Sequence, residues 1–206
     1  MRSEARGLLI DYGGVLTGPI DVALTNFCRE HGLSDDAFAT LQAPDCPFRQ
    51  EIEAYERGRY DDEAFLPRFA AALGIDRVLM NGFLAGVRPD ARMIRALASI
   101  RAHGVRVGLL SNSWGMSAYP PDLLAGAFDA VVISGLVGMR KPEPAIYRHA
   151  ADLIGLVPEA CVFVDDSAAN LAPALAVGMT VVHHQDAAAT LRALEERFGI
   201  PIEGAR

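Results

Sequence analysis

The sequence predicts an α/β protein in which a parallel, doubly wound sheet carries an inserted all-helical segment. Short apolar runs indicate buried strands, because they lack the polar alternation of a strand that faces water. Helical periodicity separates most of these runs, and strand alternating with helix is typical of a sheet covered on both faces. The predicted strands are Leu8–Ile10, Val105–Leu110, Val131–Ile133, Cys161–Val164 and Thr180–Val182.

The helices between the strands have recognisable starting residues. Asp90 and Asp186 are predicted to cap two of them, because an aspartate at this position accepts hydrogen bonds from free backbone N–H groups. Pro144 is predicted in the first turn of a third helix, where its missing N–H costs nothing. In a fourth helix, Leu171 and Leu175 share one face, and the helix is predicted to end before Gly178.

One segment, 18–87, breaks the alternation of strands and helices. It shows helical periodicity, for example at Phe65 and Phe69, and no strand pattern. We therefore predict a Rossmann-like core made of residues 1–17 and 88–206, interrupted by a helical domain. That domain is either a lid over the active edge of the sheet or a helical subdomain without a catalytic role.

Composition and charge exclude several classes of function. The 206 residues include 19 Lys and Arg against 26 Asp and Glu, and a net charge of −7 argues against nucleic acid or an anionic membrane as main partner. The three cysteines have no CxxC spacing, so neither a disulfide framework nor a zinc site is predicted. No apolar stretch approaches the roughly 20 residues of a membrane span, and the run before Asp11 is too short for a signal peptide. We expect a cytoplasmic protein; its oligomeric state is not predictable.

Carboxylates follow the first and fourth predicted strands. Asp11 ends the first strand, and the glycines that follow, Gly13 and Gly14, allow a tight turn and a close approach of a ligand. Asp165 and Asp166 follow the fourth strand, and a hard divalent cation such as Mg²⁺ would neutralise such a pair. A structural helix cap is the alternative use of each carboxylate.

Three further side chains suit an anion. Ser111 and Asn112 follow the second strand, and their hydroxyl and amide groups match phosphate oxygens, although a turn uses the same residues. Lys141 lies just before the helix that begins at Pro144, and a cation there is favourable only if an anion shares the site. Otherwise it is a solvated surface lysine. The carboxyl ends of parallel strands meet at one edge, so these groups are predicted to converge.

In combination, two stretches resemble the haloacid dehalogenase superfamily, a set of mostly Mg²⁺-dependent phosphohydrolases. They are 163–170 (Phe-Val-Asp-Asp-Ser-Ala-Ala-Asn) and 138–142 (Gly-Met-Arg-Lys-Pro). The resemblance covers essentially the whole chain, and the helical segment matches the small cap that many members place after the first motif. It implies that Asp11 is the nucleophile and accepts the phosphoryl group as an aspartyl phosphate.

The resemblance also implies the other roles in the site. Lys141 would act with Asp11 in catalysis by neutralising charge on the nucleophile and on the phosphoryl oxygens. The implied phosphate ligands are Ser111, Asn112 and Lys141, and the implied Mg²⁺ ligands are Asp11, Asp165, Asp166 and the backbone carbonyl of Gly13.

One position departs from the family pattern. The motif usually has a second Asp, the general acid/base, two residues after the nucleophile, and this chain has Gly13 there. General acid–base catalysis is typically worth about 10²–10⁴ in rate, so we expect weak activity on ordinary alkyl phosphates. Acyl, anomeric sugar and aryl phosphates, which have good leaving groups, would lose less. Asp21 is a candidate substitute acid, although a helix start explains it as well.

The predicted function is hydrolysis of a small phosphorylated metabolite, and two alternatives stay open. A haloacid dehalogenase needs no acid at Gly13, because a halide leaves without a proton, but the paired acids favour metal and phosphate. A catalytically weak phosphate-binding module is the second alternative. His183, His184 and Trp114 are minor candidates for contact with the substrate.

Overall fold

The protein is built around one parallel sheet, seen in a computed structural model that describes residues 6–84 and 86–205. The sheet has five strands in the order β3-β2-β1-β4-β5, and every neighbouring pair is parallel. Each strand predicted from the sequence is confirmed to within one residue at its ends. The strands are β1 (Gly7–Ile10), β2 (Arg106–Ser111), β3 (Ala130–Ile133), β4 (Cys161–Asp165) and β5 (Thr180–His183).

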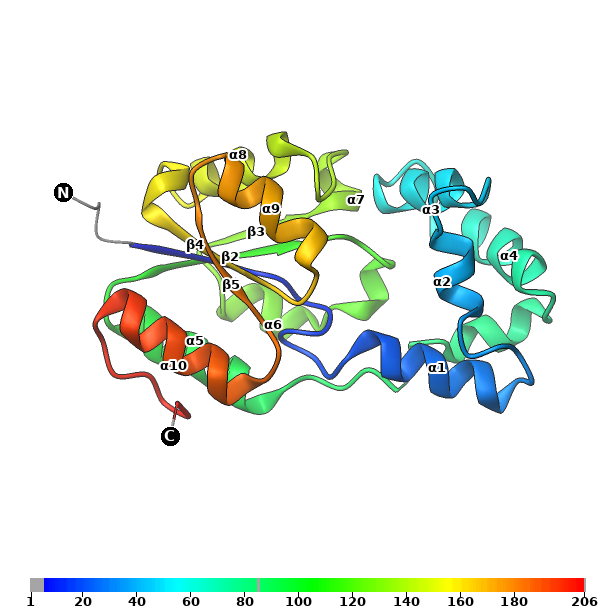
Figure 1. The fold of residues 1–206 in the computed structure, drawn as a ribbon, viewed down its shortest axis with the longest axis horizontal. Helices are drawn as coiled ribbons and strands as arrows, with labels where there is room; N and C mark the ends of the chain where they lie inside the picture. Colours follow the sequence, from blue (N-terminus) through cyan, green and yellow to red (C-terminus); the bar gives the residue numbers. More distant parts are fainter. Residues whose placement is uncertain (1–5, 85, 206) are drawn as a thin grey trace.

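Helices cover both faces of the sheet, which confirms the doubly wound fold (Figure 1). Side chains alternate along a strand, so Leu8 and Ile10 of β1 pack into one core and Leu9 into the other. The first core lies under α5 and α10, and the second lies under α8 and α9. The helices of this part are α5 (Ala91–Ala102), α6 (Pro121–Gly126), α7 (Ser134–Val137), α8 (Pro144–Leu153), α9 (Ala168–Ala176) and α10 (Ala187–Phe198), with short 3₁₀ turns η2 (Met116–Ala118) and η3 (Pro158–Ala160).

The predicted helix starts are confirmed, and the two leucines of α9 differ in burial. The Asp90 carboxylate accepts hydrogen bonds from two N–H groups of α5, the Asp186 carboxylate from one of α10, and Pro144 is the first residue of α8. In α9, however, Leu175 is 60% exposed while Leu171 is buried. The face of α9 that meets the sheet runs through Leu171 and Ala174, so Leu175 falls beyond the edge of the contact.

A group of helices lies between β1 and α5 in the chain and beside the sheet in space (Figure 1). We call the segment 20–84 the helical insertion. It packs around its own cluster of aromatic side chains, which includes Phe38, Phe65 and Phe69. Its described residues form no strand, as the sequence predicts. Its elements are α1 (Ile20–Glu30), α2 (Ala37–Gln42), α3 (Arg49–Glu56), α4 (Asp62–Leu73) and the 3₁₀ helix η1 (Arg77–Gly82).

The chain enters and leaves the helical insertion through two adjacent backbone segments. Thr17 and Pro89 form an antiparallel bridge, and the N–H of Gly18 donates to the carbonyl of Arg88 at 2.8 Å. The exact domain limits, 1–17 with 88–206 and 18–87, stay a prediction, and residues 1–5, 85 and 206 lie outside the described part. Throughout that part, none of the helices combines the length and apolarity needed to cross a membrane.

The cap of α5 gives a stability prediction. Replacing Asp90 by alanine removes the acceptor for the N–H groups of Arg92 and Met93, at 2.8 and 3.0 Å, and should cost about 1 kcal/mol of unfolding free energy. Urea denaturation followed by circular dichroism measures this. Asp152→Ala, at an exposed position in the last turn of α8, is the matched control and should cause no loss. Equal losses in both variants would contradict the capping role.

Candidate active site

A buried lysine lies at the carboxyl edge of the sheet. The Nζ of Lys141 is 2.8 Å from Oδ1 of Asp11 and 2.6 Å from Oδ2 of Asp165, and the lysine is only 1% exposed. Asp11 follows β1, Asp165 ends β4, and Lys141 comes from the loop before α8. The structure therefore brings together three of the residues that the sequence predicts for one site.

Both carboxylate oxygens of Asp165 accept hydrogen bonds. Besides Lys141, the N–H of Ser167 donates to Oδ1 at 2.8 Å, and the Asn170 amide donates to Oδ1 and Oδ2 at 3.0 and 3.1 Å. Asp165 is fully buried. Because these bonds use most of its acceptor capacity, Asp165 is well suited to hold Lys141 in place.

Asp166 completes an acidic cluster with Asp11 and Asp165. One carboxylate oxygen from each of Asp11, Asp165 and Asp166 lies within 4.8 Å of the other two, and Asp166 is exposed. Gly14 makes this approach possible: its φ is +75°, and a Cβ there would overlap Oδ2 of Asp166. The donors are hard carboxylate oxygens, so the residues present fit a divalent cation such as Mg²⁺.

The charges of the cluster also favour a bound cation. Burial raises the pKa of Asp11 to about 7; Lys141 opposes this rise, and Asp165 and Asp166 add to it. Asp166 is exposed toward the cavity that it lines, and its partial burial together with the charge of Asp165 raises its pKa. Burial disfavours the charged form of Lys141, yet the two carboxylates outweigh this effect and raise its pKa. Three carboxylates around one ammonium leave excess negative charge that a bound cation would relieve.

Ser111 and Asn112 lie at the same edge but have different partners. Ser111 is buried, with its Oγ 2.9 Å from the hydroxyl of Tyr119. The Asn112 side chain pairs with the backbone of Lys141: its Oδ1 accepts from the lysine N–H at 2.8 Å, and its Nδ2 donates to the lysine carbonyl at 3.0 Å. The Asn112 amide thus holds the Lys141 loop, and its predicted contact with phosphate stays a prediction.

Tyr119 belongs to the site, although no sequence pattern marked it. It is 4% exposed, its hydroxyl contacts Ser111, and its ring lies 4.8 Å from the ring of Tyr12 between centroids. Burial raises its pKa, so the phenol keeps its proton. The sequence around Tyr119 is typical of a proline-containing loop. Tyr119 reaches the site only because this loop folds over Ser111.

A cavity of about 790 Å³ opens between this edge and the helical insertion. Asp11, Ser111, Lys141 and Asp166 line one end of it, and side chains of the insertion line much of the rest. The cavity is far larger than a phosphate group alone requires, so it offers room for the remainder of a substrate.

Gly13 lines the cavity, and the space next to it is filled. A Cβ on Gly13 would lie 3.2 Å from Cγ1 of Ile20, the first residue of α1. Asp21, the candidate substitute acid, is exposed, accepts a hydrogen bond from the N–H of Val22 at 2.8 Å, and is absent from the cavity lining. The structure therefore favours a role for Asp21 in the first turn of the helix.

The minor candidates separate into two groups. Trp114 lines the cavity and also packs against aromatic rings of the helical insertion, among them Phe83. His183 is exposed and binds the backbone carbonyl of Asp166 through Nε2, whereas Nδ1 of His184 contacts the hydroxyl of Thr190. Neither histidine lines the cavity.

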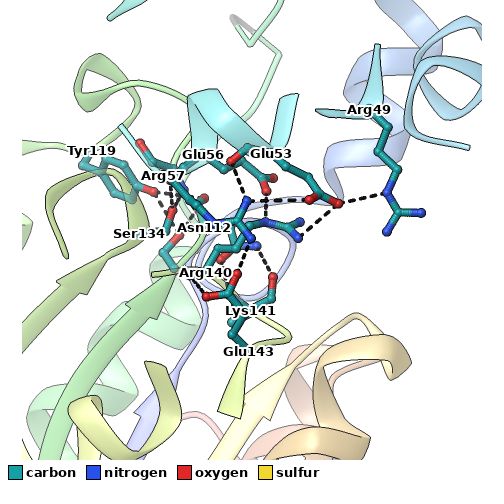
Figure 2. Close-up of polar contacts among 12 residues, drawn as sticks. Arg49, Glu53, Glu56, Arg57, Asn112, Tyr119, Ser134, Arg140, Lys141 and Glu143 are labelled. Atoms are coloured by element: carbon teal, nitrogen blue, oxygen red, sulfur yellow. Dashed lines mark hydrogen bonds and ion pairs between the residues drawn. The ribbon is translucent and has the colours of Figure 1, made fainter. Parts of the chain in front are cut away.

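An ionic network joins the helical insertion to the loop that carries Lys141 (Figure 2). The Nε of Arg140 is 2.5 Å from Oε2 of Glu56, and its Nη1 is 3.5 Å from Oε1 of Glu53; both glutamates are on α3. Arg57, just after α3, pairs with Glu143. Glu56 is 5% exposed; burial raises its pKa, and Arg140 counteracts this effect. The Arg140 guanidinium therefore compensates a buried carboxylate of the insertion.

Backbone contacts reinforce this junction. The hydroxyl of Ser134 donates to the carbonyl of Glu56 at 2.5 Å and accepts from the N–H of Ser113 at 2.8 Å. Gly58 has a φ of +72°, and a Cβ there would overlap the carbonyl oxygen of Gly135. The end of α3 is thus closely packed against the edge of the sheet.

This network gives a pH-dependent prediction. Arg140→Met leaves the Glu56 carboxylate buried without its partner and should cost about 3 kcal/mol of stability at neutral pH. A carboxyl whose pKa is raised on folding binds more protons in the folded state, so its contribution to stability falls as pH rises. The deficit in Tm against the native protein should therefore be larger at about pH 8 than at about pH 5.

Arg140→Lys keeps the charge and is the control, with a smaller deficit at both pH values. Scanning calorimetry at the two pH values makes the comparison. A deficit in Arg140→Met that is independent of pH would mean that Glu56 is not the group compensated by Arg140.

A family model described as haloacid dehalogenase-like hydrolase matches residues 6–178. The sesquiterpene phosphatase astK of Aspergillus oryzae is 30% identical over 158 residues, which cover 71% of this chain and 79% of that protein. The bifunctional epoxide hydrolase 2 of Rattus norvegicus is 35% identical over 114 residues, 52% of this chain. The matched region is only 21% of that longer protein.

Solved structures show the same fold. A HAD family enzyme from Bacteroides thetaiotaomicron, an alanine variant in complex with magnesium and inorganic phosphate, superposes with a TM-score of 0.71. It is 19% identical, and the match covers 88% of this chain and 95% of that one.

Proposed function

The chain belongs to the haloacid dehalogenase-like hydrolases, and on that premise we propose that it hydrolyses a small phosphate monoester with Asp11 as nucleophile and Mg²⁺ as cofactor. One observation carries the proposal: the Lys141 ammonium lies between Asp11 and Asp165, beside the exposed Asp166. Relatives named as phosphatases support a phosphate ester as the substrate class.

In the first step, a carboxylate oxygen of Asp11 forms a bond to phosphorus while the bond from phosphorus to the leaving oxygen breaks. An aspartyl phosphate on Asp11 and the leaving-group oxyanion result, and the oxyanion takes its proton from solvent water. Water then attacks phosphorus, and cleavage of the bond to Asp11 gives inorganic phosphate and the free carboxylate. Lys141 is positioned to balance charge on Asp11 and on the phosphoryl oxygens throughout.

Mg²⁺, when bound, would screen the carboxylates from the phosphate and stabilise charge on the transferring group. We assign it to Asp11, Asp166 and the backbone carbonyl of Gly13. Asp165 was predicted as a further ligand, but its oxygens are engaged by Lys141, Ser167 and Asn170. We therefore give Asp165 the task of positioning Lys141.

The phosphoryl group would lie between Lys141 and Ser111. The Ser111 hydroxyl can donate to a phosphoryl oxygen while it accepts from Tyr119, whose phenol keeps its proton. Asn112 contributes by holding the Lys141 backbone. We propose that the predicted domain 18–87 is a cap that excludes water from this site. We also propose that the protein is located in the cytoplasm.

The leaving group sets a limit on the reaction. At Gly13 no side chain can protonate a departing alkoxide, and Ile20 occupies the neighbouring space. Leaving groups that need no proton are therefore favoured. The same feature would suit a dehalogenase, but the three clustered carboxylates and the buried lysine favour metal and phosphate.

The function is tested with para-nitrophenyl phosphate, whose leaving group needs no acid. We expect multiple turnovers with Mg²⁺, loss of turnover on adding EDTA, and recovery on adding Mg²⁺ back. Asp11→Asn should lower kcat by at least about a thousandfold, because it removes the nucleophile. Val78→Asn, at an exposed position of the insertion, is the control and should keep full activity.

Turnover of a haloacid that survives EDTA would support the dehalogenase instead. Phosphate binding without turnover would support the binding module. Full activity of Asp11→Asn would contradict the assignment of the nucleophile.

A second prediction concerns the missing acid. Gly13→Asp combined with Ile20→Ala supplies a carboxyl group and the space for it, and should raise kcat on alkyl phosphates by about 10²-fold. The gain on para-nitrophenyl phosphate should be small, because its leaving group needs no proton. Ile20→Ala alone is the control. An equal gain on both substrates would contradict the role proposed for this position.

A further inference from the structure

We propose that the alcohol part of the substrate is an extended apolar group, in place of a sugar or another polyhydroxylated metabolite. The inference rests on the proposed phosphatase activity and names the class of ester that the cavity accepts. The reactive end of the cavity takes the phosphate, so the rest of its roughly 790 Å³ must select the body of the substrate.

A group of apolar side chains lines the cavity beyond its reactive end. It combines one residue of α4, residues in and after η1, and the indole that follows β2. Their side chains offer methyl, thioether and aromatic surface, which an apolar group can cover with a gain in free energy. These wall residues are Leu66, Met80, Phe83, Leu84 and Trp114.

The polar side chains that the helical insertion adds to the wall are already paired or face solvent. The Tyr55 hydroxyl donates to Asp62 at 2.7 Å, and the Arg77 guanidinium donates to Asn81 at 2.9 Å. Arg77, Asn81 and Gln42 are exposed. Across the described residues, every buried side-chain nitrogen or oxygen has a hydrogen-bond partner. The polar groups that a substrate hydroxyl could meet on this wall are therefore solvated ones, and a hydrogen bond to them replaces a bond to water.

This distribution decides between classes of ester. A sugar phosphate would exchange the water around its hydroxyl groups for hydrogen bonds to solvated side chains, with little net gain in free energy, and its other hydroxyl groups would meet apolar wall, which is costly. An apolar body would lose nothing of that kind and would displace water from the wall. Specificity of this type depends on the size and the apolarity of the substrate body. Each methylene that becomes buried should raise the affinity for the substrate by about fourfold.

The test is a series of para-alkylphenyl phosphates from phenyl to para-butylphenyl, in which the leaving group stays equally acidic while the apolar body grows. We expect kcat/KM to rise by at least about tenfold across the series, mainly through KM. An anomeric hexose phosphate should be a poorer substrate than phenyl phosphate. A flat series, or a preference for the hexose phosphate, would overturn the inference while para-nitrophenyl phosphate is still turned over.

Binding separates this inference from the proposed function. With Mg²⁺ present, para-butylbenzylphosphonate should bind at least about tenfold more tightly than benzylphosphonate in calorimetry, whether or not the protein turns over esters. Tighter binding without any turnover would retain the apolar site and reject the phosphatase. Equal binding of the two phosphonates would reject the apolar site.

Variants locate the effect on the wall. Leu84→Asn should reduce the preference for para-butylphenyl over phenyl phosphate by about fivefold, because it replaces apolar wall with an amide. Leu66→Asn is a second variant from another element, and retained circular dichroism checks folding. Val78→Asn, 66% exposed and outside the wall, is the matched control and should keep the native preference. An unchanged preference in both wall variants would overturn the assignment.

Discussion

The buried ammonium of Lys141 is the interaction on which the rest of the site depends. A charge with 1% exposure is tolerable only because Asp11 and Asp165 lie within hydrogen-bond distance of it. This requirement ties together the ends of two strands and the loop before α8. Further groups then fix its partners: Asn170 holds Asp165, and Asn112 holds the backbone of the lysine itself. The hydrogen-bond network leaves Asp166 as the exposed carboxylate of the cluster.

The same loop also connects the site to the helical insertion. Arg140 precedes Lys141 in the chain and compensates the buried carboxylate of Glu56 on α3. The position of the insertion and the position of the lysine are therefore constrained by adjacent residues. Because Gly58 has no Cβ, its backbone approaches the carbonyl oxygen of Gly135 closely at this point. These contacts consequently fix the cavity wall of the insertion relative to the end of the cavity that is lined by Asp11 and Lys141.

Much of this arrangement follows from local sequence patterns, and the rest depends on contacts between distant segments. Strands, helix starts and the convergence of Asp11 with Lys141 were predictable, because apolar runs, capping residues and strand ends obey short-range rules. The hydroxyl of Tyr119 on Ser111 and the side chain of Ile20 beside Gly13 were not. Each of these contacts joins residues whose spacing carries no periodic signal, and each forms only when loops fold over the sheet edge.

The paired backbone at Thr17 and Pro89 has a consequence for how this architecture diversifies. The chain leaves the sheet and returns to it at one narrow junction. The strands therefore constrain the position of that junction but not the length of the segment inserted between its two sides. A recombination event, or a deliberate graft, at these two residues would exchange the helical insertion, and with it one side of the cavity, as a single unit. The residues proposed for catalysis at the sheet edge would stay in place, so a change of specificity would not require a change of the proposed chemistry.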